Sequence, residues 1–123
     1  RDDIKVISDV EFGVYGGENY LVVTDEEADK LAGDYIRDTL WAFNTDFIIE
    51  HCDCLEFSNE DESSLKAIQE KCEPSNNIIK ALIGNNIEDF IADAIASDGR
   101  EHYLAQYDGI ENKEGDFFIY RTN

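Results

Sequence analysis

The chain has 123 residues and a formal net charge of −19, because 29 Asp and Glu residues oppose only 10 Lys and Arg residues. Its length and its 42% hydrophobic content predict a single compact acidic domain over residues 1–123 and exclude wholesale disorder. The charge excludes attraction to nucleic acid or to anionic membranes as the main activity, and without a secretory signal or an apolar run of roughly 20 residues we expect a cytoplasmic protein with no membrane span.

The first part of the chain is expected to form strands followed by a helix. Alternating hydrophobic residues precede a turn signal at residues 16–19, and a run of β-favouring residues follows it. This pattern predicts a hairpin over about residues 10–23. Thr24 with Glu27 is a capping-box pattern, so we expect a helix to begin there, with an apolar face that continues to Phe43.

Two further helices are expected in the middle of the chain. Asn44 or Thr45 can cap a helix over residues 47–55, because both side chains accept hydrogen bonds from a first helical turn. Asn59 with Glu62 repeats the capping pattern before a helical apolar face. The only proline, at residue 74, is predicted to end that helix.

The last third of the chain is expected to return from helix to strand. An apolar segment at residues 78–83 stops at a glycine, and residues 87–95 define a last helix. Residues 103–107 and 117–120 are predicted to form two strands joined by a polar loop. The fold class is therefore predicted as α+β, with a mainly antiparallel sheet from N- and C-terminal strands and three to five helices between them, packed on one face.

Acidic residues concentrate in three stretches without Lys or Arg, at residues 6–29, 38–65 and 81–99. Any one acid can serve only to cap a helix or to keep the protein soluble. Solubility alone, however, needs a net charge of only about 2–8 in magnitude, and further repulsion destabilises a fold. We therefore interpret the excess as a partner-binding surface on the predicted helices, formed by Glu26, Asp29, Asp34, Asp38, Glu60, Asp61, Glu62, Glu88, Asp89 and Asp93.

Charge spacing limits how such a surface can work. A row of acids on one helix carries one charge per about 5–6 Å, whereas duplex DNA carries one per about 1.7 Å of axis. One helix is therefore too sparse to imitate a phosphate backbone. We expect several acidic rows to lie side by side if the surface is to approach that density.

In its size and charge, and in having only three cysteines, the chain resembles the DNA-mimic proteins that phages and mobile elements use against restriction and CRISPR enzymes. A second resemblance, to the C-terminal pattern of uncharacterised small phage-type proteins, is carried by Ser97-Asp98-Gly99-Arg100-Glu101-His102-Tyr103-Leu104 and Tyr107-Asp108-Gly109.

The charge and the first resemblance imply a non-enzymatic inhibitor or decoy in the host cytoplasm. It would bind the basic surface of a nucleic-acid-binding protein or nuclease complex, without cofactor, metal, membrane or direct nucleic-acid contact. The same charge also fits an alternative, an acidic adaptor that binds a protein partner without mimicking nucleic acid.

Cysteine and histidine residues give a third, enzymatic or metal-binding alternative. His51, Cys52, Cys54 and Cys72 include the ligand types of a tetrahedral zinc site. Their spacing lacks the paired knuckles of structural zinc sites, which favours cysteines that pack between helices. A nucleophilic Cys52 or Cys72 activated by His102 is the remaining catalytic arrangement.

Overall fold

The computed structural model describes residues 6–7, 10–11, 13–15, 18–53 and 56–123, with side chains from residue 19 onward. These residues form an α+β fold divided into two compact units. The first unit contains residues 1–34 and 95–123, and the second contains residues 35–94. The expectation of one domain stays a prediction, and each unit is described by itself.

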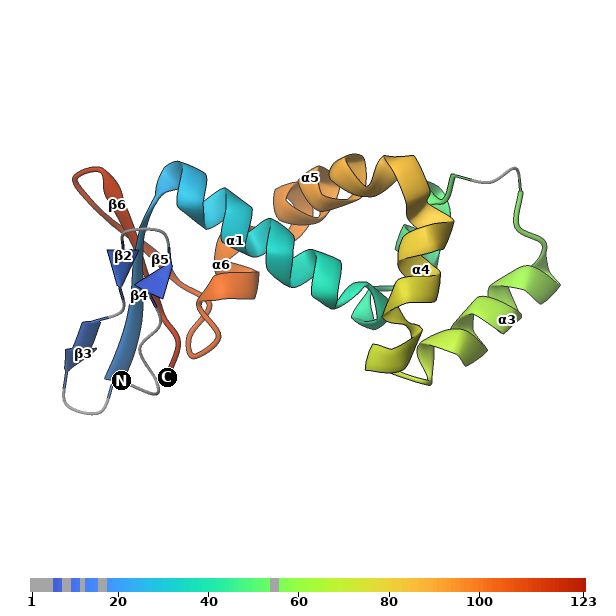
Figure 1. Ribbon diagram of the computed structural model, residues 1–123, viewed down its shortest axis with the longest axis horizontal. Helices are drawn as coiled ribbons and strands as arrows, with labels where there is room; N and C mark the ends of the chain where they lie inside the picture. Colours follow the sequence, from blue (N-terminus) through green and yellow to red (C-terminus); the bar gives the residue numbers. More distant parts are fainter. Residues whose placement is uncertain (1–5, 8–9, 12, 16–17, 54–55) are drawn as a thin grey trace. The chain divides into compact units, whose positions relative to one another are not determined.

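The first unit contains the strands, and its main sheet has the antiparallel order β3-β4-β6-β5. The strands are β1 (Val6–Ile7), β2 (Val10–Glu11), β3 (Gly13–Tyr15), β4 (Glu18–Thr24), β5 (Glu111–Glu114) and β6 (Phe117–Arg121). β4 pairs with β6 along its length, so the N- and C-terminal strands meet as predicted (Figure 1).

The core of the first unit forms where alternate strand residues face helical residues. Leu21 lies opposite Tyr120 in the β4–β6 pair, and both side chains are buried. Ala28 and Ala32 are one helical turn apart in α1 (Asp25–Asp38) and are also buried. Small residues at this spacing give α1 an apolar stripe whose opposite side carries acids.

The predicted hairpin is confirmed for β3 and β4, in which Val14 lies opposite Asn19. β2 is not part of it, because Val10–Glu11 pairs with β1. The glycines of the predicted turn, Gly16 and Gly17, lie outside the described residues.

Helix α1 begins where the capping box predicts. The backbone N–H of Thr24 donates to Glu27 Oε1 at 2.9 Å, and the N–H of Glu27 donates to Thr24 Oγ1 at 3.3 Å. The predicted continuation to Phe43 is wrong, because α1 ends at Asp38. The N–H of Thr39 bonds to the carbonyl of Ile36, which tightens the last turn, and a 3-10 turn at Leu40–Ala42 follows.

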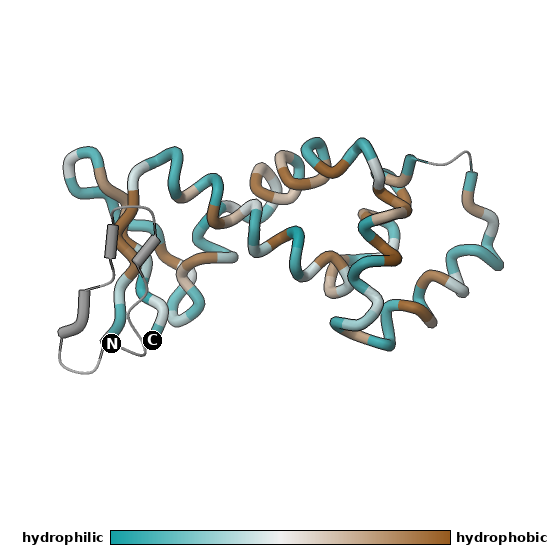
Figure 2. The backbone as a smooth tube through the Cα atoms, in the orientation of Figure 1, coloured by the Kyte–Doolittle hydropathy of each residue, from teal (hydrophilic) through white to brown (hydrophobic). Residues whose placement is uncertain are grey.

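The second unit is helical. Its elements are the last residues of α1, then α2 (Thr45–His51), α3 (Asn59–Gln69), α4 (Asn76–Ile83) and most of α5 (Ile87–Asp98). These five helices, each of at least seven residues, lie between the N- and C-terminal strands in the chain, within the predicted range. Figure 2 shows hydrophobic positions recurring between hydrophilic ones along the helices, and the buried side chains include Ile48, Leu65, Ile79, Ile83 and Phe90.

Three helix boundaries predicted in the middle of the chain need correction. The N-cap of α3 is Ser58, in a capping box with Asp61, rather than Asn59 with Glu62. α3 ends at Gln69, before Pro74, which lies in a 3-10 turn at Glu73–Ser75. α2 has the predicted Asn44 cap but ends at His51, while Leu55 of the predicted helix lies outside the described residues.

The predicted strand at residues 103–107 is wrong. Residues Arg100–Leu104 form the short helix α6, and the strand that pairs with β6 is Glu111–Glu114, part of the predicted loop. Tyr103, Leu104 and Ala105 are buried in succession, and a short apolar run without a period fits a helix as well as a strand. That all helices pack on one face of the sheet stays a prediction.

Among the described residues, no helix combines the length and hydrophobicity needed to cross a membrane.

Candidate functional site

The acidic side chains that the structure describes are exposed or partly exposed in both units. None of the Asp and Glu residues whose side chains the structure describes is buried. The first unit contains 16 acidic and six basic residues, a net charge of −10, and the second contains 13 and four, a net charge of −9. Each unit is therefore strongly acidic by itself.

The predicted binding residues on the first two-thirds of α1 differ in their surroundings. Glu26 is exposed, and within the described residues no hydrogen bond or ion pair is shown for it. Asp29 pairs with Arg100 Nη1 at 3.1 Å, and Asp34 pairs with Lys30 Nζ at 3.1 Å one turn away. Asp29 therefore also has a role within the fold.

The three predicted residues at the start of α3 are also unequal. Asp61 accepts hydrogen bonds from the backbone N–H and the hydroxyl of Ser58, at 3.0 and 2.9 Å, and these bonds lower the pKa of Asp61 below its usual value. Glu62 lies 3.5 Å from Lys66 Nζ. Glu60 is exposed and has no partner shown among the described residues.

The predicted residues of α5 include two that bind other elements of the second unit. Glu88 accepts a hydrogen bond from Arg37 at 2.6 Å, and Asp93 contacts His51 at 2.7 Å. Asp89 is exposed, as is Asp38 at the end of α1, and neither has a partner shown within the described part of the chain. Four of the ten predicted residues, Glu26, Asp38, Glu60 and Asp89, are thus available without breaking a described contact.

The acidic rows of α3 and α5 do not lie side by side. Figure 1 shows α4 between these two helices. Their charges therefore do not add up to the line density of a phosphate backbone. What the second unit offers is a broadly negative surface with acids on separate helices.

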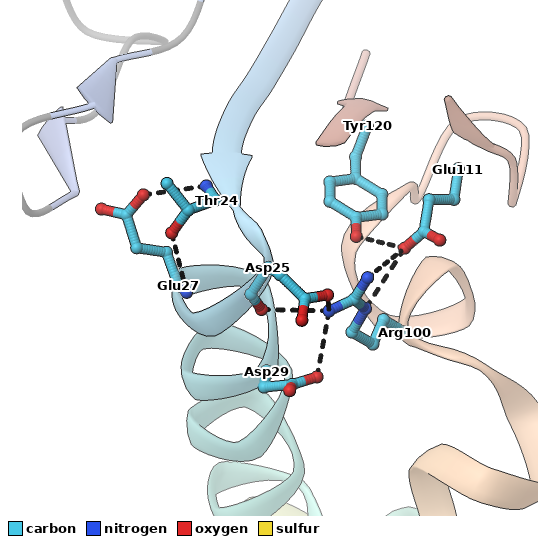
Figure 3. A network of polar contacts seen from close by, with 7 residues as sticks. All are labelled: Thr24, Asp25, Glu27, Asp29, Arg100, Glu111 and Tyr120. Atoms are coloured by element: carbon cyan, nitrogen blue, oxygen red, sulfur yellow. Dashed lines mark hydrogen bonds and ion pairs between the residues drawn. The ribbon is translucent and has the colours of Figure 1, made fainter. Parts of the chain in front are cut away.

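Arg100 forms a polar network in the first unit that the sequence analysis did not identify (Figure 3). Its side chain is 12% exposed. Its Nη1 donates to the carbonyl and a carboxylate oxygen of Asp25, at 3.0 and 2.7 Å, and its Nε and Nη2 donate to Glu111 Oε1 at 3.2 and 3.0 Å. The guanidinium lies 4.7 Å from the ring centroid of Phe118. This one side chain therefore joins α1, α6, β5 and β6.

Two pKa values follow from this network. Burial alone would lower the pKa of Arg100, but its hydrogen bond to Asp25 and the neighbouring negative charge raise it, so the guanidinium stays charged. Burial and a hydrogen bond from its hydroxyl to Glu111 raise the pKa of Tyr120 above its usual value. The network thus places the neutral phenol of Tyr120 beside the ion pair of Arg100 and Glu111.

His51 forms the corresponding polar contact in the core of the second unit. It is 8% exposed; its Nδ1 lies 2.8 Å from the Phe47 carbonyl and its Nε2 lies 2.7 Å from Asp93 Oδ2. Both partners are hydrogen-bond acceptors, so both contacts are satisfied when the ring is protonated and donates from both nitrogens. The rings of Phe47 and Phe90 lie 4.6 and 5.2 Å from its centroid.

The pKa of His51 reflects these contacts. Burial by itself lowers it, but the bonds to Phe47 and Asp93 and the charges of Asp93 and Glu50 together raise the pKa above the ordinary 6.5. In its protonated form, with both nitrogens donating to these partners, His51 offers no lone pair to a metal ion or a substrate proton.

The cysteine and histidine residues do not assemble a metal site in the described part of the chain. Among those residues, no group of three or more His, Cys, Asp or Glu side chains is placed to hold a metal ion. Cys72 is exposed in the second unit, and His102 is exposed in the first. Cys54 lies outside the described residues.

Comparison with known protein families, curated proteins and solved structures finds no match for this chain.

Proposed function

We propose that the protein is a non-enzymatic inhibitor or decoy that binds the basic nucleic-acid-binding surface of a partner protein. The observation that carries the proposal is the solvent exposure of the acids combined with a charge of about the same size, −10 and −9, in each unit. Phage counter-defence against a restriction or CRISPR nuclease is the setting that the first resemblance in the sequence favours.

The protein's own cations cannot neutralise this surface. Arg100, Arg37, Lys30 and Lys66 each already lie against acids of the chain. Even if every Lys and Arg paired with one acid, the excess of 19 carboxylates would remain. That excess attracts a cationic groove over a distance and speeds association.

The mechanism we infer is electrostatic competition rather than an atomic copy of a duplex. α4 lies between α3 and α5, so the acidic rows of these two helices are not adjacent, and one row alone carries only one charge per about 5–6 Å. A Lys- or Arg-lined groove needs only a strong negative field to exclude its nucleic acid by occupancy. Binding of this kind weakens with salt, because the Debye length is about 8 Å at physiological ionic strength.

The test is affinity capture from a lysate of bacteria that carry a restriction or CRISPR nuclease. With the protein as bait, a nucleic-acid-binding protein should be retained at low salt, released at high salt, and displaced by added duplex DNA. Retention that ignores both salt and DNA would overturn the proposal. Release by salt without displacement by DNA would favour the acidic adaptor instead.

Charge variants identify the residues responsible. Glu26→Gln, Glu60→Gln and Asp89→Asn together remove three exposed acids that have no partner shown among the described residues. The triple variant should slow association with the captured partner by about threefold or more. The matched control, Glu26→Asp with Glu60→Asp and Asp89→Glu, keeps the charge and should keep the rate. Equal rates for both variants would contradict a role for these acids.

A further inference from the structure

Two adjoining hollows lie on the surface of the second unit, and they share Pro74. One has a volume of about 350 Å³ and is lined by Ala67, Ile68, Lys71, Pro74, Ser75 and Ile78. The other has a volume of about 610 Å³ and is lined by Asp38, Glu73, Pro74, Asn76 and Asn77. The first is mainly apolar in its residues, and the second carries two carboxylates.

The apolar hollow lies between the end of α3 and the start of α4. Ile78 is 52% exposed, whereas its neighbour Ile79 is fully buried in the core. Ile78 is therefore a large apolar side chain that the fold of the second unit leaves largely in water. Among the described residues that line this hollow, Lys71 alone is charged.

The acidic hollow has a fixed wall and two available carboxylates. The Asn76 side chain donates to the carbonyl of Arg37 at 2.6 Å and accepts from the N–H of Trp41 at 3.2 Å, so its position is set from both sides. Asp38 and Glu73 are exposed, and neither has a hydrogen bond or ion pair shown with a described residue. A cationic side chain is the complementary occupant.

Asp38 also lies where the fold does not favour it. It is the last residue of α1, and the carbonyl end of a helix dipole disfavours a negative charge. No described contact compensates for this cost. An acid that opposes the local field of its own helix fits a role in binding a positive group.

We infer that the two hollows together form a docking site for a basic, amphipathic segment of a partner protein. One apolar side chain of the segment enters the hollow of Ala67 and Ile78, and a Lys or Arg nearby enters the hollow of Asp38 and Glu73. Lys71 sets the direction, because it repels a cation from the apolar side. The inference rests on the proposed function in one respect, that the partner is basic.

This site would give the proposed decoy a slow dissociation rate, which charge alone does not provide. Long-range attraction mainly raises the association rate, whereas buried apolar contact and a held ion pair slow dissociation. Nucleic acid does not fit the site, because its phosphates would face Asp38 and Glu73. The occupant is therefore a protein segment.

The experiment uses two synthetic peptides of about 15 residues, long enough to form a helix. Both contain the same Leu, Arg and Ala residues. One places Leu on a single helical face, and the other scatters Leu around the helix. In an NMR titration of the full chain, the amphipathic peptide should shift the methyl signals of Ala67, Ile68 and Ile78. It should bind about fivefold or more tightly than the scattered peptide at physiological salt.

Variants then separate the two hollows. Ile78→Ser should abolish the preference for the amphipathic peptide, and Ile78→Val should retain most of it. Asp38→Asn with Glu73→Gln should weaken binding about threefold more than Glu56→Gln with Asp89→Asn, which removes the same charge elsewhere in the second unit. Asp38→Asn alone should keep or raise the melting temperature while weakening binding.

Three outcomes would overturn the docking site. These are equal affinity for the two peptides, shifts spread over acids of both units without the Ile78 methyls, and equal losses in the two charge variants. None of them would affect capture and DNA displacement, the test of the proposed function. Conversely, capture that ignores salt and DNA would remove the decoy but leave a peptide site with the expected shifts in place.

Discussion

His51 couples the core of the second unit to an acid on its surface. Its ring is buried beside Phe47 and Phe90, whereas its partner Asp93 is 62% exposed. The raised pKa of His51 means that the fold binds this proton more tightly than the unfolded chain does. His51 therefore stabilises the fold below the ordinary pKa of 6.5, and this contribution is lost as the pH rises through the higher folded value.

Asp93→Asn tests this coupling. Burial is the largest single influence on the pKa of His51, and it acts to lower that pKa, so loss of the Asp93 charge should lower the pKa. We expect the NMR titration of the His51 Hε1 proton to move to lower pH in Asp93→Asn. Thermal melts between pH 6 and pH 8 should depend less on pH than in the wild type. His102→Gln, at an exposed histidine, is the control and should keep the wild-type dependence. An unchanged His51 titration would contradict the assignment.

Which residues are exposed could be predicted from the sequence, but their partners could not. Asp and Glu are rarely buried without a partner, and the described acids follow that rule. The contact of Arg37 with Glu88 spans 51 residues, and that of Arg100 with Asp25 spans 75. No local spacing encodes such pairs. The sequence therefore predicted an acidic surface but missed that six of its ten chosen acids also make contacts within the fold.

At the scale of elements, local capping signals predicted where helices start better than where they end. The Thr24–Glu27 box and the Asn44 cap are present as expected, because each forms within a few residues. α3 ends at Gln69, and Cys72, three residues later, has φ of +59°. A residue other than glycine rarely adopts a positive φ, so the presence of a cysteine at this position did not predict that conformation.

Helix α6 was not predicted, because the residues that contact its first turn are distant in the sequence. Gly99 has φ of +82° and precedes a helix of only five residues, too short to have a clear period. Arg100 in its first turn contacts Asp25, Asp29 and Glu111. These contacts favour a helical start at Arg100, and the helix then includes Tyr103 and Leu104, where the local pattern predicted the start of a strand.

Arg100→Ala should destabilise the first unit strongly. The change leaves three carboxylates without their shared cation and removes the guanidinium from the Phe118 ring. Breaking a fully buried ion pair costs roughly 3–5 kcal/mol. Because Asp25 and Asp29 are more than half exposed, we expect a smaller loss of about 2–3 kcal/mol in the free energy of unfolding.

Urea denaturation of Arg100→Ala and Arg100→Lys would measure this loss. Lys keeps the charge but not the planar fork that reaches Asp25 and Glu111 together, so Arg100→Lys should fall between the wild type and Arg100→Ala. Asn112→Ala, at an exposed residue of β5, is the control and should change stability by less than about 0.5 kcal/mol. If Arg100→Ala were as stable as this control, the network would have no structural role.

At the scale of the whole molecule, the repulsion among acidic residues must outweigh the attraction between acidic and basic residues. The internal ion pairs use some of the 29 acids, but 10 basic residues cannot offset more than 10 of them at one-to-one pairing. Raising the ionic strength from 0.1 M to 1 M shortens the Debye length from about 10 Å to about 3 Å. Salt therefore screens the long-range repulsion more completely than it weakens the close pairs.

We accordingly expect sodium chloride to raise the melting temperature at neutral pH. A gain of about 1 kcal/mol corresponds to roughly 3–6 °C for a protein of this size. The raised pKa of His51 adds a pH dependence of known sign, so the protein should melt at a higher temperature in mildly acidic buffer than at pH 8. The Asp93→Asn variant separates the salt effect from that of His51, because it should keep the salt response while losing part of the pH response. If salt and mild acid both lowered the melting temperature, the acids would be paired structural residues, and a surface free to bind a basic partner would not exist.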